Sequence, residues 1–461
     1  MATLSELDLL GLAQYLSVNE RSRDVDWHLQ FHYNIFEGRD PEYAQQRTRL
    51  EAVRSQFQLA LGKLSDHRLH FYNTSEPLND QYNCLHVARF ESLAYPINPD
   101  FTKPRRQRKP DRPLRITCAG AIRTEKGHSR LSRLVLSLWQ GCLANGKAQM
   151  VVQSKKSRRR DVPRLQLAQP GRPQAKAGFT LPDETNSSEP IVYVRQPLST
   201  EDYVKFVREA DIGLMLYDSH RYYARRAGVL GEFLAAGIPV IVPAGCWLAE
   251  QIKEPMFQHL DRVADSLPVT RHNFLPKMTF GDASDPAVES LAIPHSSEEM
   301  LVSFRLGEPR CKGRYVRLEA FQFDKGANLL QRTAQTIGHR AERGLTRTLF
   351  HLHPNAAQVR LHWRNAYHHE LLTVDGVEVS FHSTQSHSGT YPAGAVGLIA
   401  ADYSAVPSLI REMIAHFDHY KKTAEEFSRD WFRRHDPAET VAQLVKHRAH
   451  RPGLLTDYEA A

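Results

Sequence analysis

The sequence predicts an α/β protein whose parallel-sheet regions are interrupted by an antiparallel β-sandwich. Before residue 265, apolar strand-like runs alternate with amphipathic stretches, a rhythm typical of a parallel sheet flanked by helices. Residues 266–390 instead contain short alternating segments separated by turn residues, which is typical of a sandwich or jelly-roll. Because α/β character returns over residues 391–450, the sandwich is predicted to be an insertion in the second lobe.

The first lobe is expected to span residues 1–101 and to be short. A strand is predicted at residues 25–35, "VDWHLQFHYNI", and a helix at residues 41–64, with Pro41 at its start. A second strand is predicted at residues 68–75. Residues 102–113 are basic, proline-rich and without periodicity, so they are interpreted as a linker between the lobes.

The second lobe is expected to begin with residues 114–265 and to resume after the sandwich. Ser199 precedes two acidic residues, which predicts a helix N-terminus at this point. One further strand and two or three helices are expected within residues 391–450. The remaining predicted strands lie at residues 114–120, 148–153, 191–196, 211–217 and 239–243, and the predicted helices at 129–146, 199–210 and 228–237.

The sandwich contains one strong turn signal and many histidines. Residues 374–379, "VDGVEV", predict a hairpin. His351 and His353 occupy alternate positions, which share a face on a strand, and a further histidine-rich stretch spans residues 368–370. This set has no recognisable metal-ligand spacing, so solvated strand histidines and no metal are expected. The triplet "DVD", which contains Asp24 and Asp26, is interpreted as a chance occurrence rather than as a metal site.

Charge and cysteine usage restrict the class of protein. The 60 Lys and Arg residues against 52 Asp and Glu give a net charge of +8, which favours anionic partners. The five cysteines form no CxxC pair and indicate a reducing compartment. The chain has no run of eighteen apolar residues and no basic secretion-signal start, so a cytoplasmic protein is expected.

Two basic stretches, residues 103–109 and 154–160, lack interleaved aromatic residues. They are therefore interpreted as solvated loops, and no nucleic-acid partner is expected. The alternative is peripheral contact with acidic lipid headgroups at the inner face of a membrane.

Two loops of the second lobe carry the candidate chemistry. In the first, Gly120 follows a predicted strand, and Arg123 and Lys126 precede a helix. In an open α/β sheet, ligands bind outside the carboxyl ends of the strands, where helix N-termini offer free N–H groups to anions. The two cations would hold a phosphate there. The alternative is a solvated turn, because Lys and Arg are common on surfaces.

The second loop opens the predicted helix at residues 228–237. Gly228 permits close approach, the N–H groups of Val229 and Leu230 begin the helix, and Glu232 lies one turn inside it. A carboxylate accepts hydrogen bonds from two vicinal hydroxyls, so Glu232 would bind a sugar. The alternative is that Glu232 complements the helix dipole.

These residues resemble a known family. The segments "GAIRTEKG", "ADIGLMLY" and "YYARRAGVLGEFLAAGIPVIVPAG" resemble, in order and spacing, the donor-binding half of retaining GT-B glycosyltransferases, the family that includes sucrose synthase-like and mannosyltransferase enzymes. The likeness covers residues 25–250 and 393–447 and implies two Rossmann-like lobes, the first of them incomplete. It assigns Arg123 and Lys126 to the diphosphate and Glu232 to the ribose, with the nucleotide sugar as donor and no further cofactor.

The sequence departs from that family at two points. The family's E-x7-E motif would place a glutamate where Ala224 stands, so Arg225 or Tyr223 would have to replace it at the donor sugar. The resemblance nominates His32 for the reaction centre, and His28, inside the strand, is the weaker candidate. Only about 25 residues precede this strand end, so most of the first half-sheet is expected to be missing.

The resemblance implies a retaining, hexosyltransferase-like enzyme of polysaccharide biosynthesis. It would move a sugar from a nucleotide-diphosphate donor to a glycan or lipid-linked acceptor, with the sandwich binding the acceptor or a partner protein. The alternative is a non-catalytic carbohydrate-binding or scaffold protein derived from a degenerate transferase. Ala224 and the short first lobe favour the alternative, whereas the joint presence of Arg123, Lys126, Gly228 and Glu232 favours the enzyme.

Overall fold

The computed structural model forms two compact units. The first unit comprises Met1–Pro99, Ser219–Gly228 and Trp431–Ala461, and the second comprises Asp100–Asp218 and Val229–Asp430. No helix among the described residues has both the length and the apolar character needed to cross a membrane. The structure describes residues 2–35, 46–105, 108–120, 123–154, 189–195, 198–264, 269–281, 286–307, 315–338, 345–365, 371–383, 396–400 and 402–446.

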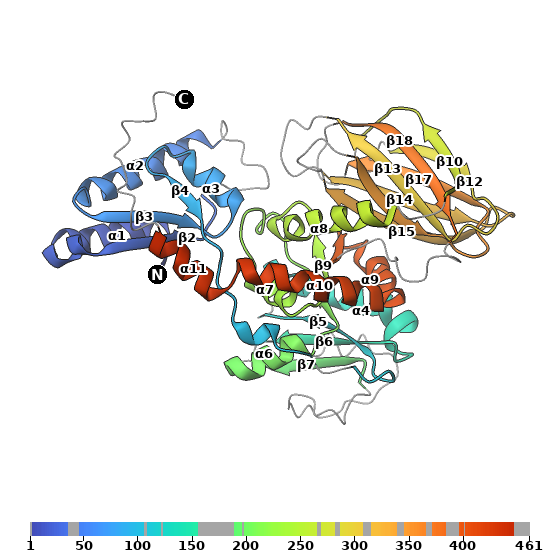
Figure 1. Ribbon diagram of the computed structural model, residues 1–461, viewed down its shortest axis with the longest axis horizontal. Coiled ribbons are helices and arrows are strands. Elements are labelled where there is room, and N and C mark those ends of the chain that lie inside the picture. Colours follow the sequence, from blue (N-terminus) through green and yellow to red (C-terminus); the bar gives the residue numbers. More distant parts are fainter. Residues whose placement is uncertain are drawn as a thin grey trace. The chain divides into compact units, whose positions relative to one another are not determined.

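The first unit contains a parallel sheet of four strands in the order β1-β2-β3-β4 (Figure 1). The strand order follows the chain, so it does not reverse within the described part of this sheet. Its strands are β1 (Ala2–Leu4), β2 (Asp26–Phe31), β3 (Arg68–Asn73) and β4 (Phe90–Ser92). Its helices are α1 (Glu6–Ser17), α2 (Arg47–Lys63), α3 (Glu76–Asn83) and α11 (Pro437–Lys446).

The core of the first unit is built from aromatic side chains. Phe31 at the end of β2 packs against Phe57 of α2, Tyr82 of α3 and Phe90 of β4, with ring centroids 5.4–5.7 Å apart. Such pairs bury large apolar areas and hold the helices on the sheet. The strand β2 thereby fixes the backbone that immediately precedes His32.

The second unit contains a parallel sheet of six strands in the order β19-β9-β8-β5-β6-β7. Its strands are β5 (Leu114–Cys118), β6 (Ala148–Ser154), β7 (Ile191–Arg195), β8 (Ile212–Leu214), β9 (Val240–Pro243) and β19 (Gly397–Ala400). The chain runs outward through β6 and β7, then returns past β5 to β8. This is the Rossmann order, and it leaves a crevice where the order reverses, between β5 and β8.

Six helices accompany this sheet in the part of the second unit that the structure describes. Ser199 caps α6 by accepting a hydrogen bond from the Asp202 N–H at 3.0 Å, which confirms the predicted helix start. The apolar faces of α4 and α9 pack together through residues such as Leu134 and Ile410. The helices are α4 (Leu131–Leu138), α6 (Thr200–Arg208), α7 (Gly228–Ala235), α8 (Trp247–Ala264), α9 (Val406–Ala415) and α10 (Phe417–Arg434).

Two antiparallel sheets lie between α8 and β19 along the chain. One has the order β10-β18-β13-β16, with β11 also paired to β18, and the other has the order β12-β17-β14-β15. Their strands are β10 (Val269–Leu275), β11 (Met278–Phe280), β12 (Ala287–Ala292), β13 (Glu299–Leu306), β14 (Tyr315–Phe323), β15 (Leu329–Gly338), β16 (Thr346–His351), β17 (Gln358–Asn365) and β18 (Leu372–His382).

The two antiparallel sheets share a core. The ring of Trp363 on β17 lies 5.0 Å from that of Phe304 on β13 and 6.2 Å from that of Phe280 on β11, so side chains of one sheet pack against the other. The expected fold class, α/β with Rossmann-like parallel sheets and an inserted antiparallel β region, is confirmed.

The predicted hairpin at residues 374–379 is wrong. Strand β18 runs without interruption from Leu372 to His382. Opposite Phe304 the register shifts, because Ser303 pairs with Glu378 and Arg305 with Asp375. Gly376 adopts a φ of +54°, so the "DG" pair forms a bulge within one strand instead of a turn between two.

The predicted solvated linker is also wrong in part. Arg105 donates hydrogen bonds to the carbonyls of Arg208 and Gly237, and Arg112 donates to Asp211 across 3.3 Å. The side chain of Asp211 is 4% exposed, and a carboxylate so deeply buried requires cationic partners. Residues 102–113 therefore pack within the second unit, although Arg106 and Gln107 lie outside the described residues.

Several element boundaries differ from the predictions. Strand β2 ends at Phe31, and α2 begins at Arg47, while Pro41 lies outside the described residues. Strand β8 is only Ile212–Leu214. Helix α4 ends at Leu138 and continues as a π-helical turn over Trp139–Leu143. Periodicity alone does not register such a local change in hydrogen bonding.

Candidate functional site

The reversal point of the six-stranded sheet carries a small hollow. It lies beyond the carboxyl ends of β5 and β8 and is small, with a cavity volume of about 20 Å³. Parallel α/β sheets bind ligands at this position. The lining residues are Cys118, Ala119, Gly120, Lys126, Leu131, Leu214, Leu216 and Tyr217.

Gly120 forms the turn that leaves β5. Its φ of +85° lies in the left-handed region that favours glycine, and its N–H donates a 2.6 Å hydrogen bond to the Gln153 side chain on β6. A Cβ at this position would lie 2.6 Å from Lys126 Nζ and 3.3 Å from a methyl group of Val229. The absence of a side chain at Gly120 therefore makes room for the lysine.

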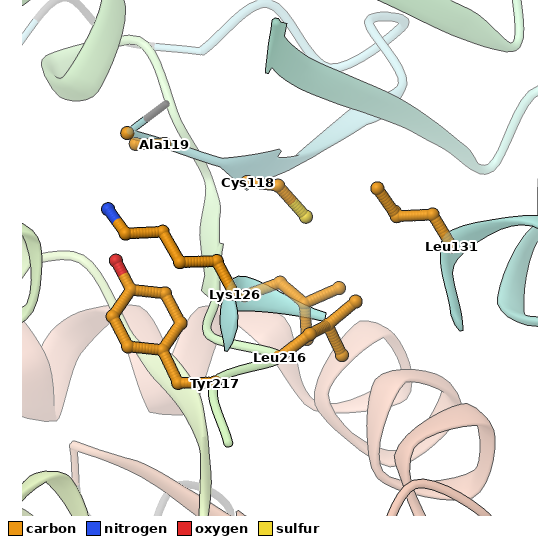
Figure 2. Close-up of a pocket in the computed structure, with 8 residues that line it drawn as sticks. Cys118, Ala119, Lys126, Leu131, Leu216 and Tyr217 are labelled. Atoms are coloured by element: carbon orange, nitrogen blue, oxygen red, sulfur yellow. The ribbon is translucent and has the colours of Figure 1, made fainter. Parts of the chain in front are cut away.

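Lys126 and Tyr217 present their polar ends to the same space. Lys126 Nζ lies 5.1 Å from the centroid of the Tyr217 ring, a cation–π distance. Figure 2 shows the two side chains side by side, with the amine and the hydroxyl pointing the same way. Burial and the charge of Arg123 lower the pKa of Lys126, while Glu125 and Glu232 oppose that shift. A half-buried cation of this kind can bind an anion in a place from which water is excluded.

Glu232 is held by a tyrosine. The hydroxyl of Tyr203, on α6, donates a hydrogen bond to Glu232 Oε2 across 2.6 Å. Burial raises the pKa of Glu232, and the Tyr203 hydrogen bond and the charge of Lys126 partly oppose this rise. Glu232 therefore faces a specific donor and a nearby cation, which is more than complementing a helix dipole requires.

Arg123 is the more exposed of the two predicted cations. Its side chain is 59% exposed and lies 3.6 Å from Glu125. Its charge acts on the pKa of Lys126, so the two cations are electrostatic neighbours. Residues 121–122, which join Arg123 to Gly120, lie outside the described residues.

The helix that carries Glu232 begins where the sequence predicts. Gly228 is exposed at the first position of α7, and Val229 faces the Gly120 turn. The side chain of Leu230 is fully buried. The structure thus brings Gly120, Lys126 and Val229 together at the end of β5, and the charge of Glu232 acts on Lys126.

Two predicted site residues, His32 and Arg225, belong to the first unit. His32 directly follows β2, and its Nδ1 lies 2.8 Å from Thr74 Oγ1. Burial and the charges of Arg225 and Arg226 lower the pKa of His32 to about 4. The Arg225 guanidinium lies 5.5 Å from the centroid of the Tyr33 ring. His32 is therefore a neutral imidazole at pH 7 with a cation nearby.

Ala224 and Tyr223, also in the first unit, pack at its hydrophobic core. Ala224 is fully buried, and its carbonyl accepts a hydrogen bond from the Ser75 hydroxyl. A glutamate side chain at this position would have to enter that core. The surroundings of Ala224 thus fit a small apolar residue.

His28 and Asp26, the weaker site candidates, contact neighbouring side chains of the first unit. His28 stacks on His70 with ring centroids 4.8 Å apart, and its Nδ1 lies 3.1 Å from the Tyr72 hydroxyl. Asp26 lies 3.1 Å from Arg68 at the first residue of β2, at the opposite end of this strand from His32. Asp26 thus has a cationic partner within the first unit.

The predicted shared face of the sandwich histidines is wrong. Strand β16 ends at His351, so His353 lies beyond the strand, where alternation no longer applies. The other histidine stretch, residues 368–370, and the basic loop over residues 155–160 lie outside the described residues.

Sequence reasoning missed Tyr203, Tyr217 and Gln153. Tyr217 is the last residue of the predicted strand 211–217, so its position at a strand end could have been used as a signal. The sequence predicts the helix that carries Tyr203, but not the contact of Tyr203 with Glu232, which is 29 residues further along the chain.

Comparisons with known proteins give only distant likenesses. No family model and no curated relative matches the sequence. A UDP-forming α,α-trehalose-phosphate synthase from Burkholderia xenovorans is 14% identical with a TM-score of 0.32, and the match covers 53% of this chain and 58% of that one. An E. coli trehalose-6-phosphate structure bound with UDP-2-fluoro glucose is 16% identical with a TM-score of 0.34, covering 52% and 58%. The chain thus spans less than two thirds of their length, and likenesses this weak carry no argument about activity.

Proposed function

We propose that this protein is a GT-B-like glycosyltransferase that binds a nucleotide-diphosphate sugar in its second unit. One observation carries the proposal: Lys126 and the Tyr203–Glu232 pair accompany a glycine turn at the reversal point of a Rossmann-ordered sheet. A cation beside a carboxylate suits a ligand that has both a phosphate and a sugar hydroxyl pair. The sequence resemblance also implies that Lys126 contacts the diphosphate and that Glu232 contacts the ribose.

The proposed roles follow from the charges. Lys126, with Arg123 nearer the solvent, would neutralise the diphosphate and stabilise the charge that develops as it leaves. Glu232 would accept hydrogen bonds from the ribose hydroxyls. The roles that the resemblance implies for His32 and Arg225, which belong to the first unit, stay predictions. The low pKa of His32 makes it a hydrogen-bonding group rather than a cation.

A calorimetric titration with UDP, GDP and ADP and their glucose and mannose conjugates tests the donor site. We expect one nucleotide to bind and Lys126→Ala to weaken binding about 10–100-fold, the loss typical of a charge-assisted hydrogen bond. Glu232→Gln should weaken binding of the same nucleotide. Glu201→Gln, an exposed position on α6, is the charge-matched control and should bind like the wild type. A folded wild-type protein that binds none of these nucleotides would refute the donor site.

The non-catalytic alternative is supported by Ala224, a fully buried residue at the position where the family's E-x7-E motif has its first glutamate. It predicts nucleotide or glycan binding without turnover. Incubation with the nucleotide sugar that binds, followed by detection of released nucleoside diphosphate with and without glycan acceptors, separates the two functions.

A further inference from the structure

A cluster of three metal-ligating side chains lies where the inserted β region meets the Rossmann sheet of the second unit. His351 is the last residue of β16 in the insertion. Glu412 lies on α9, and His416 is the residue that caps the end of this helix. All three side chains are partly buried, and they form the one such group found among the described residues.

The donor atoms of the cluster are close enough to share one ion. Those of His351, Glu412 and His416 all lie within 4.8 Å of one another. His351 Nε2 and Glu412 Oε1 are 3.5 Å apart, near the roughly 3.3 Å that separates two ligands on a tetrahedral zinc ion with bonds of about 2.0–2.1 Å. The rings of His351 and His416 stack with centroids 3.6 Å apart, so the two imidazoles are direct neighbours.

The local structure explains why the three side chains meet. Glu412 and His416 are four residues apart, and residues at this spacing lie on the same face of a helix. That face is turned toward the insertion, because Glu412 Oε1 lies 3.5 Å from Nε2 of His351, and α9 also contacts β15 of the insertion. His351 reaches it from the end of β16. The side chain of Glu412 is 13% exposed and that of His351 is 19% exposed, so the cluster is shielded but reachable.

We propose that His351, Glu412 and His416 bind a divalent transition-metal ion, with zinc as the best match. Two imidazoles and one carboxylate form a donor set that zinc accepts, whereas magnesium and calcium prefer oxygen ligands. The ion would join β16 of the insertion to the end of α9 and so fix the insertion on the parallel-sheet part of the second unit. Three protein ligands leave at least one position for water or another ligand. This site is separate from the proposed nucleotide site and does not depend on it.

Metal binding by the purified full-length chain tests the proposal directly. After stripping with a chelator and dialysis against zinc, we expect about one zinc ion per chain by mass spectrometry, and a rise in the thermal unfolding midpoint that reverses on chelation. Cobalt(II) should give visible absorption bands of a site with nitrogen ligands. Glu412→Gln and His416→Gln should each weaken zinc binding by more than the 10–100-fold typical of losing an outer-shell partner.

The matched control is His272→Ala. His272 also lies beside a glutamate, Glu378, within the same insertion, but in the described structure this pair is not part of a three-ligand group. This variant should bind zinc like the wild type. If a cluster variant fails to fold, protection of His351 and His416 of the wild type from diethylpyrocarbonate by zinc, mapped by mass spectrometry, provides the same test. Absence of stoichiometric zinc and cobalt binding, or equal binding by the folded cluster variants, would overturn the proposal.

Discussion

Tyr203 donates a 2.6 Å hydrogen bond to Glu232 and thereby joins α6 to α7 beside the reversal point of the sheet. The buried hydroxyl satisfies a carboxylate that is largely removed from water. It also fixes which oxygen of Glu232 stays available for a ligand, because Oε2 is the atom that accepts from Tyr203. The tyrosine is thus a positioning residue for the proposed ribose contact.

Tyr203→Phe should destabilise the protein at neutral pH. The change leaves Glu232 without its hydroxyl donor, and an unsatisfied buried polar group costs about 1–3 kcal/mol. Denaturant unfolding at pH 7 measures the loss. Tyr193→Phe is the matched control, because the buried hydroxyl of Tyr193 on β7 has no hydrogen-bond partner among the described residues. Equal effects of the two changes would show that the Tyr203–Glu232 bond contributes no stability.

The loss of stability in Tyr203→Phe should depend on pH. Burial raises the pKa of Glu232 above its ordinary value, and the Tyr203 hydrogen bond opposes the rise, so its loss raises that pKa further. A carboxyl group whose pKa is higher in the folded state than in the unfolded state binds its proton more tightly when folded. Its contribution to the unfolding free energy is therefore complete below the unfolded-state pKa and is lost as the pH rises through the folded-state pKa. The difference in unfolding free energy between wild type and Tyr203→Phe should therefore shrink as the pH is lowered from 7 toward 4.5. A constant difference would contradict this assignment.

Gly120→Ala should impair the nucleotide site more than the fold. Alanine at φ +85° is strained by about 1–2 kcal/mol, and its Cβ would displace Lys126 Nζ, which lies 2.6 Å away. Gly146→Ala is a close control, because Gly146 has a φ of +72° and nothing within 4 Å of the added Cβ. Both variants should lose similar stability in denaturant unfolding. Only Gly120→Ala should weaken nucleotide binding in calorimetry, and unchanged binding would separate this turn from the proposed donor site.

Glu319→Gln should destabilise the inserted β region. The fully buried Glu319 carboxylate is surrounded by three guanidinium groups, those of Arg317 at 3.1 Å, Arg332 at 2.6 Å and Arg364 at 3.2 Å. Burial raises its pKa, but the Arg332 hydrogen bond and the arginine charges outweigh this effect and hold the pKa below its usual range. Removing the negative charge takes away the partner that the three arginines share, although Arg317 keeps Asp402 at 2.6 Å, and should cost about 3 kcal/mol. Chemical denaturation measures this loss.

A control variant and a pH dependence test the prediction for Glu319. Glu289→Gln, on strand β12 of the same sheet, removes the same charge outside the arginine cluster and should change stability by less than about 0.5 kcal/mol. Because the lowered pKa of Glu319 stabilises the fold above its unfolded value, the wild type should lose this contribution as the pH falls below about 4.5. A Glu319→Gln protein as stable as the wild type at pH 7 would show that the charge cluster is neutral for folding.

Much of the second unit's sheet could be predicted from sequence, because its strands are buried on both faces. Runs such as residues 239–243 are continuously apolar and are bounded by turn residues, so the strand appears directly in the pattern. Gly120 and Gly228 mark two of the turns that surround the site. The strand order, which places the hollow between β5 and β8, depends on long-range pairing that no local pattern contains.

Failures of prediction have local physical causes. The bulge at Gly376 and a hairpin turn use the same positive-φ glycine, so "DG" predicts a change of direction only when its flanks pair with each other. Strand β1 has three residues, too few for periodicity, although Ser5 and Asp8 form a capping box that marks the start of α1. The ligands of the proposed metal site lie 61 and 65 residues from His351 along the chain, so only folding brings them together.

Acid should destabilise the first unit through His435. This side chain is 7% exposed, stacks on Trp431 at 4.1 Å and has its Nδ1 2.8 Å from the Trp431 carbonyl. Burial and the charge of Arg226 lower its pKa from 6.5 to about 4. Between these values the unfolded chain binds a proton that the folded protein does not, so stability falls as the pH drops from about 6.5 to about 4, by at most about 3 kcal/mol. Denaturant unfolding across this range should show a smaller slope for His435→Phe, which keeps a ring on Trp431 but cannot titrate. The exposed His295→Phe should keep the wild-type slope, and an unchanged slope in His435→Phe would rule out His435 as the group responsible.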